Sequence, residues 1–152
     1  MNGKTDIKEI AGLLARLILG GVFIYAGLVK ALAPAEEFGY AIESYRLFTP
    51  RLALVIAYTA PWIELYAGLL LAAGVFTRWS ALFTGAMLVF FEFLLGQAWL
   101  RKLPVTSCGC FGSTGSNSLG HEFIQNLGLL LLAWGAFRYG AAFSADRAVE
   151  KL

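Results

Sequence analysis

Residues 10–29 read IAGLLARLILGGVFIYAGLV, a run of twenty residues whose single charge is Arg16. At about 1.5 Å of rise per residue, an α-helix of this length covers roughly 30 Å, the thickness of the hydrocarbon core of a bilayer. A cleaved signal peptide is the alternative, because Lys4 and Lys8 precede the run. The run is longer than the apolar core of most signal peptides. We therefore expect it to be the first membrane-spanning helix.

The composition of the whole chain is that of a membrane protein. Hydrophobic residues make up 59% of the 152 residues and charged residues 14%, whereas about 25% of a soluble domain is usually charged. The length suits a single integral-membrane domain over residues 1–152. A net charge of +2, without a basic patch interleaved with aromatic residues, argues against a nucleic-acid partner.

Three further apolar runs follow, over about residues 52–76, 79–100 and 123–139. The connection at residues 77–78 is so short that the second and third runs must be antiparallel neighbours. Pro61 lies inside the second run, where it removes one backbone hydrogen bond and is expected to kink the helix. The chain is therefore predicted to be all-α, with a four-helix transmembrane bundle.

Residues 34–47, between the first two runs, are too few and too charged to span a bilayer. Phe38, Ile42 and Tyr45 recur at helical spacing, and acidic residues lie on the opposite side. This pattern predicts a short amphipathic interfacial helix between the first and second spanning helices.

The basic residues outside the runs indicate the orientation, because Lys and Arg are enriched in cytoplasmic loops. Six lie on the side of the two termini and five on the other side, a small excess that favours cytoplasmic termini. The loop over about residues 104–120 is then expected outside the cytoplasm. The two sets are Lys4, Lys8, Arg78, Arg138, Arg147 and Lys151, and Lys30, Arg46, Arg51, Arg101 and Lys102.

Charged residues at membrane depth are the first candidates for function. A charge at the centre of a membrane helix costs about 2.5–3.5 kcal/mol on insertion scales, so such residues usually face the bundle and pair. Counting from the helix ends places Arg16 and Glu64 within roughly 9 Å in depth, and we expect them to pair. Lys30 and Glu92 are expected to form a second pair. These pairs either lock the helix register or form a proton path through Glu64 with Tyr58, or through Glu92.

The two cysteines of the chain lie in the motif Cys108-Gly109-Cys110-Phe111-Gly112, within a polar loop rich in Gly, Ser and Thr. A disulfide between cysteines two residues apart reaches the usual geometry only with strain. Strained, exposed disulfides are easily reduced, which suits thiol–disulfide exchange. The glycines permit a tight turn and leave the sulfurs open, and Phe111 is expected to anchor the loop.

Two other interpretations of the motif remain open. The cysteines are reduced and structural, or both thiolates bind Cu(I) with His121 as a third ligand. Two cysteines and one histidine are few ligands for copper and too few for a four-ligand zinc site, so no metal is expected. His121 alone is expected to be an ordinary residue at a helix start, and Asn126 to make hydrogen bonds inside the bundle.

Three groups of residues resemble the patterns of a known family. They are Arg16-Leu17, Gly20, Phe23, Ala26-Gly27 and Lys30; Pro61, Glu64-Leu65, Gly68, Gly74 and Arg78; and Cys108-Gly109-Cys110-Phe111-Gly112. With them the chain resembles the DoxX-like/MauE family of small bacterial membrane proteins, and the cysteine motif is similar to that of the MauE branch. Close members of that branch are expected to have a basic residue where this chain has Gln125.

The resemblance implies a four-helix bundle in a bacterial inner membrane and a role in redox chemistry. MauE is linked with the maturation of methylamine dehydrogenase beside a thioredoxin-like protein, and DoxX relatives with membrane oxidoreductases. We therefore expect Cys108 and Cys110 to exchange disulfides with a thioredoxin-like or secreted partner, as a thiol–disulfide oxidoreductase if the protein is an enzyme.

Other functions and components stay open at this stage. A quinone is the candidate electron acceptor, although no sequence feature identifies a quinone site. Arg16, Lys30, Glu64 and Glu92 are expected to shape the bundle and handle protons. The alternatives are a non-enzymatic subunit of a membrane oxidoreductase, or a small carrier of metal ions or solutes.

Overall fold

The computed structural model describes residues 7–103, 119–141 and 144–145. This part of the chain is helical and contains no strand, which confirms the predicted all-α class. The helices are α1 (Ile7–Leu32), α2 (Ala35–Ser44), α3 (Pro50–Ala73), α4 (Thr77–Leu100) and α5 (Leu119–Tyr139).

Three of these helices, α1, α3 and α4, are long and apolar enough to cross a membrane. They correspond to the first three predicted runs, with shifted ends. α3 starts at Pro50 because proline suits the first turn of a helix, where its missing N–H is not needed. α3 ends at Gly74, whose φ of 74° is left-handed, a conformation that glycine adopts at little cost. Local chemistry thus sets both ends of the helix.

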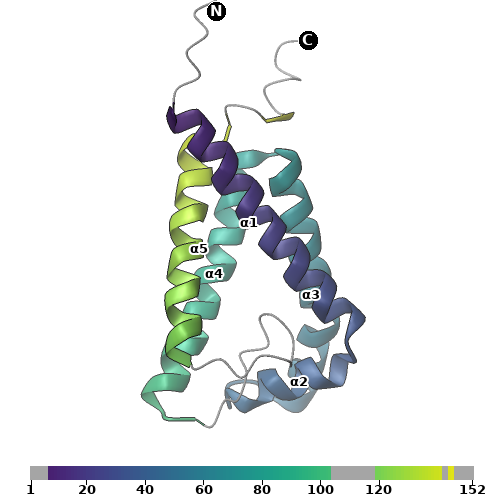
Figure 1. Cartoon of the computed structure of the whole chain (residues 1–152). Coiled ribbons are helices and arrows are strands. Elements are labelled where there is room, and N and C mark those ends of the chain that lie inside the picture. Colours follow the sequence, from purple (N-terminus) through teal and green to yellow (C-terminus); the bar gives the residue numbers. More distant parts are fainter. Residues whose placement is uncertain (1–6, 104–118, 142–143, 146–152) are drawn as a thin grey trace, which may run out of the picture.

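The four long helices α1, α3, α4 and α5 alternate in direction along the chain, and α2 lies across one end of them (Figure 1). α1 packs mainly on α3 and also on α5, α4 packs on α5, and α2 packs on α3. The start of α1 and the end of α5 lie at one end of the molecule. α2 lies at the other end, together with the end of α4 and the start of α5 (Figure 1).

Glycines allow α1 and α3 to touch through their backbones. A Cβ added to Gly27 would lie 2.7 Å from the carbonyl oxygen of Pro61, and one added to Gly68 would lie 2.8 Å from the carbonyl oxygen of Gly20. Small residues at such crossings are typical of membrane helices, whose association depends on close packing. These contacts fix the register of the antiparallel pair, with Gly27 opposite Pro61 and Leu65.

The interior and the outer surface are both apolar. The main buried cluster joins side chains of α1, α3, α4 and α5, whereas many large hydrophobic side chains point outward from the same helices. An apolar exterior is what lipid requires of a membrane protein. The buried cluster comprises Ala15, Leu19, Phe23, Leu71, Ala81, Leu88, Ala133 and Ala136.

Candidate functional site

A buried ion pair joins the last turn of α1 to the middle of α3. Lys30 Nζ donates hydrogen bonds to both carboxylate oxygens of Glu64, each at 2.7 Å. The two side chains are only 2% and 1% exposed. Charges removed from water are stable only when they are paired and hydrogen-bonded, and this geometry satisfies both oxygens of the carboxylate.

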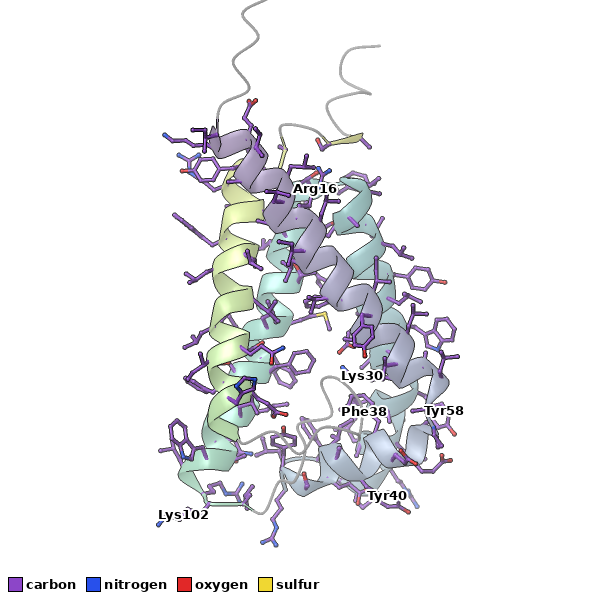
Figure 2. The ribbon with its side chains drawn as sticks, viewed as in Figure 1. Arg16, Lys30, Phe38, Tyr40, Tyr58 and Lys102 are labelled. Atoms are coloured by element: carbon purple, nitrogen blue, oxygen red, sulfur yellow. The ribbon has the colours of Figure 1, made fainter. Side chains whose placement is uncertain are left out.

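Aromatic rings from two other helices cover the ammonium group. Lys30 Nζ lies 5.0 Å from the ring centroid of Phe38 on α2 and 5.6 Å from that of Phe91 on α4. Both distances are within the range of a cation–π interaction. Figure 2 shows Lys30 and Phe38 close together where α2 meets the bundle. Four helices therefore contribute to the surroundings of one ion pair.

A small cavity of about 40 Å³ lies beside the ion pair, between α1, α3, α4 and α5. Its walls are mostly apolar and include a few polar side chains. A cavity needs about 10–15 Å³ to hold one water molecule, so this one has room for a few. The polar lining residues are Lys30, Glu64, Glu122, Gln125 and Asn126.

Asn126 connects α5 to α4 at the level of the cavity. Its side chain is buried, and Nδ2 donates to the carbonyl oxygen of Leu88 at 3.0 Å and to Glu92 Oε2 at 2.6 Å. The expected hydrogen bonding of Asn126 inside the bundle is confirmed. Among the described residues, no donor reaches the buried atoms Glu92 Oε1 and Glu122 Oε2.

The two predicted pairings, Arg16 with Glu64 and Lys30 with Glu92, were both wrong. Glu64 is bound by Lys30 instead, and Glu92 accepts its hydrogen bond from Asn126. The register of α1 on α3 explains the difference, because Gly27 lies opposite Pro61 and Leu65. Arg16 is eleven residues before Gly27, about 16 Å along the helix and beyond the reach of Glu64.

The structure separates Tyr58 from Glu64, the two residues suggested for a proton path. Tyr58 is 56% exposed, whereas Glu64 is buried. Tyr58 and Glu64 are six positions apart, and each residue of an α-helix rotates by about 100°. The two side chains therefore differ by about 240° around the axis of α3 and leave it on different faces. Figure 2 shows Tyr58 on the outer side of the molecule.

Arg16 lies near the opposite end of α1 from Lys30 (Figure 2). It is buried, and Nη1 donates to the carbonyl oxygen of Gly140 at 3.0 Å. A Cβ added to Gly74 would lie 2.5 Å from Nη1, so the guanidinium group fits against the backbone at the end of α3. Arg16 thus connects α1 with the ends of α5 and α3 and takes no part in the Lys30–Glu64 pair.

Replacing Arg16 with leucine is expected to lower the free energy of unfolding in detergent by roughly 1.5–3 kcal/mol, the usual contribution of a hydrogen bond from a charged group. Unfolding by SDS titration, followed by tryptophan fluorescence, measures the change. Lys8→Leu is the matched control, because Lys8 is exposed on the same helix. Equal losses in the two variants would contradict an anchoring role for Arg16.

The cysteine motif Cys108, Gly109, Cys110, Phe111 and Gly112 lies outside the described residues. The description stops at Leu103 and resumes at Leu119. Both of these positions belong to the end of the molecule at which α2 lies (Figure 1).

Sequence reasoning missed Glu122, Phe38 and Phe91 as parts of this region. For Glu122 a signal was present, because residues four apart share a helix face and Glu122 comes four residues before Asn126. The two aromatic residues carry no comparable signal, since their position over Lys30 depends on how α2 and α4 pack.

These observations define the class of protein. Long helices with apolar outer faces, enclosing an ion pair and polar side chains, form a helical integral-membrane protein.

The particular family follows from a comparison of the sequence with family models. The model described as methylamine utilisation protein MauE matches residues 8–138, and the chain therefore belongs to the MauE family. No curated protein and no solved structure matches the chain. The resemblance to MauE inferred from the helix and cysteine residues is confirmed at the level of the family.

Proposed function

We propose that this protein is a membrane thiol–disulfide redox protein in which Cys108 and Cys110 cycle between dithiol and disulfide. The observation that carries the proposal is where the cysteine segment is attached. Leu103 and Leu119, which flank it, belong to the end of the molecule at which α2 lies (Figure 1), and Lys30 of the buried ion pair lies where α2 meets the bundle (Figure 2). The chain also belongs to a family whose description is methylamine utilisation protein MauE, and this membership supports the proposal.

The exchange oxidises the partner and reduces this protein. A thiolate of the partner attacks the Cys108–Cys110 disulfide, and a mixed disulfide forms while the other cysteine leaves as thiolate. The partner's second thiol then attacks the mixed disulfide. The partner loses two electrons and two protons and becomes a disulfide, and this protein becomes a dithiol. A membrane quinone, reduced to the hydroquinone by two electrons and two protons, is the class of acceptor that would restore the disulfide.

We propose that α5 completes a four-helix transmembrane bundle with α1, α3 and α4. Its 21 residues cover about 31 Å as an α-helix. In this arrangement α2 lies in the interface, both termini are cytoplasmic, and the cysteine loop is on the outer side of a bacterial inner membrane. Disulfides persist in that compartment. The partner is a thioredoxin-like or secreted protein, and the process is the maturation of a periplasmic dehydrogenase in methylamine utilisation.

Single substitutions of the cysteines test this function. In membranes, Cys108→Ser or Cys110→Ser is expected to accumulate a mixed disulfide with a thioredoxin-like protein that lacks its own second cysteine. The partner is supplied as its mixed disulfide with thionitrobenzoate, which leaves as the thiolate when the remaining cysteine attacks the partner sulfur. The adduct persists because neither protein keeps a resolving thiol. Non-reducing electrophoresis and mass spectrometry identify it, and reductant removes it.

The double variant Cys108→Ser/Cys110→Ser is expected to give no adduct, and Ser113→Ala is the matched control for a change in the same loop. Absence of an adduct from both single variants would contradict the redox function. That result would favour a non-enzymatic subunit of a membrane oxidoreductase, for which the fully satisfied Lys30–Glu64 pair is a suitable structural element. A carrier would instead lose transport in Glu64→Gln.

A further inference from the structure

The outer face of α3 carries aromatic residues with polar atoms near the middle of the helix. Tyr58, Trp62 and Tyr66 recur every four residues, so they form one stripe along α3. Their side chains are 56%, 53% and 62% exposed, and Figure 2 shows Tyr58 on the outer side of the molecule. Trp62 is the thirteenth of the 24 residues of α3, and the two tyrosines lie about 6 Å from it along the axis, one on each side. The stripe therefore lies at the depth of the hydrocarbon core when α3 spans a membrane.

The neighbouring helix α4 shows the distribution that lipid favours. Tryptophan and tyrosine are enriched where a membrane meets water, because their rings are apolar and their polar atoms need partners. The exposed tryptophans of α4, Trp79 and Trp99, lie in its first and last turns. Between them its exposed aromatic residues are Phe83, Phe90 and Phe93, which have no polar side-chain atom. On α3 the polar aromatic residues lie in the middle instead, where lipid offers no hydrogen bonds.

The polar atoms of the stripe lack partners on their own helix. Tyr58, Trp62 and Tyr66 make no hydrogen bond with any other residue that the structure describes. The exposed hydroxyl of Thr59, on the same helix, donates to the carbonyl oxygen of Val55 at 2.8 Å. A threonine hydroxyl reaches its own backbone because its side chain is short, whereas a tyrosine ring holds the hydroxyl away from the helix. Since a hydroxyl without a partner in hydrocarbon is costly, this face needs a neighbour that brings hydrogen-bonding groups to the same depth.

A second copy of the chain offers the matching groups. Two copies that enter the membrane in the same orientation bring residues of equal depth together when their α3 helices pack about a two-fold axis. A tyrosine hydroxyl both donates and accepts, so Tyr58 and Tyr66 can each bond to the same residue of the second copy. Their oxygens can also accept from the indole N–H of Trp62, which only donates. The charge near this depth, Glu64, is buried and bound to Lys30, so the stripe itself carries no repulsion.

We propose that the outer face of α3, marked by Tyr58, Trp62 and Tyr66, is the interface of a parallel homodimer within the membrane. Hydrogen bonds between the tyrosines and contacts between the rings stabilise it. Leu69 extends this face toward the turn between α3 and α4, because it follows Trp62 by seven residues and is 46% exposed. The interface depends neither on the cysteines nor on the proposed redox function.

Cross-linking through a single introduced cysteine tests the interface. The full chain with Cys108→Ser and Cys110→Ser has no cysteine, and Leu69→Cys adds one thiol to the proposed interface. In phosphatidylcholine vesicles, copper phenanthroline oxidises two such thiols to an intermolecular disulfide, which non-reducing electrophoresis detects as a band of twice the mass of the chain. We expect Leu69→Cys to form this band several times faster than the same change at Leu82.

Leu82→Cys is the matched control for collisions between molecules. Leu82 is 53% exposed on α4 and lies five residues after Thr77, as Leu69 lies five residues before Gly74. The two thiols therefore have similar depth and exposure and differ in the helix that carries them. Diluting the protein with lipid is expected to reduce cross-linking of Leu82→Cys first, because its encounters depend on collision alone.

Removal of the hydroxyl groups alone tests the chemistry of the interface. Tyr58→Phe/Tyr66→Phe, added to Leu69→Cys, keeps both rings and is expected to weaken association by roughly five- to tenfold, as the loss of two hydrogen bonds between membrane helices would. The shift is measured as the lipid-to-protein ratio at which half of the chain is cross-linked. Tyr40→Phe, at a 69% exposed position of α2, is the control and is expected to leave this ratio unchanged.

Two results in vesicles would overturn the proposal. One is an equal rate of cross-linking for Leu69→Cys and Leu82→Cys, and the other is an unchanged ratio in Tyr58→Phe/Tyr66→Phe. If Leu69→Cys does not fold, Val55→Cys replaces it, because Val55 precedes Trp62 by seven residues and is 58% exposed.

The same cross-link made in bacterial membranes identifies the neighbour of α3 by mass spectrometry. Two copies of this chain joined through Leu69→Cys would support the homodimer. A different membrane protein joined at this position, with no product that contains two copies of the chain, would overturn it.

Discussion

Replacing Lys30 with methionine is expected to lower the free energy of unfolding by about 3–5 kcal/mol, the usual loss when one partner of a buried ion pair is removed. The loss is large because, within the part of the chain that the structure describes, both oxygens of Glu64 are hydrogen-bonded only to Lys30 Nζ, and the carboxylate is 1% exposed. SDS titration of the purified protein, followed by tryptophan fluorescence, measures the change.

A double variant shows whether the missing charge is the cause. Lys30→Met/Glu64→Leu removes both charges, and apolar replacement of a buried pair is often neutral or stabilising. We expect it to recover most of the stability that Lys30→Met loses. Lys8→Met, at an exposed position of α1, is the control for loss of a lysine. A double variant as unstable as Lys30→Met would mean that packing around Lys30, and not the ion pair, stabilises the bundle.

Gly27→Leu is expected to destabilise the bundle by about 3 kcal/mol or more, at the upper end of the range for overpacked interiors. A Cβ at this position would lie 2.7 Å from the Pro61 carbonyl oxygen and 2.8 Å from the Leu65 backbone nitrogen. Backbone atoms cannot turn aside as a flexible side chain does, so α1 and α3 must separate. Thermal unfolding in detergent, followed by circular dichroism, measures the loss.

Gly21→Leu is the matched control, because it makes the same change on the same helix where a Cβ would meet nothing within 4 Å. Its effect is expected to stay within about 1 kcal/mol, in the direction set by the higher helix propensity of leucine. Similar losses for Gly21→Leu and Gly27→Leu would contradict the close crossing of α1 and α3.

Much of the secondary structure was predictable because it depends on local sequence. The run over residues 10–29 contains one charge, and its hydropathy alone predicts a membrane helix there. The observed helix extends to Ile7 and Leu32, beyond both ends of that run. The family, too, was predictable from residues that lie close together in the sequence, and the match to MauE over residues 8–138 confirms the family.

The candidate site was predictable only as a set of residues. Lys30, Glu64, Glu92 and Asn126 stand out in the sequence because polar side chains at membrane depth are costly and need partners. Glu122 could have joined them through its spacing from Asn126. The redox role of Cys108 and Cys110 stays a prediction, and the trapping of a mixed disulfide tests it.

The sequence by itself determined the class of protein, the positions of the apolar helices and the family. Only the tertiary structure decided that Lys30, and not Arg16, binds Glu64, and that Asn126 binds Glu92. Hydropathy reports the depth of a residue but not the helix it faces. The register of α1 on α3 instead depends on backbone contacts at Gly20, Gly27 and Gly68, and these contacts exist only once the helices are packed.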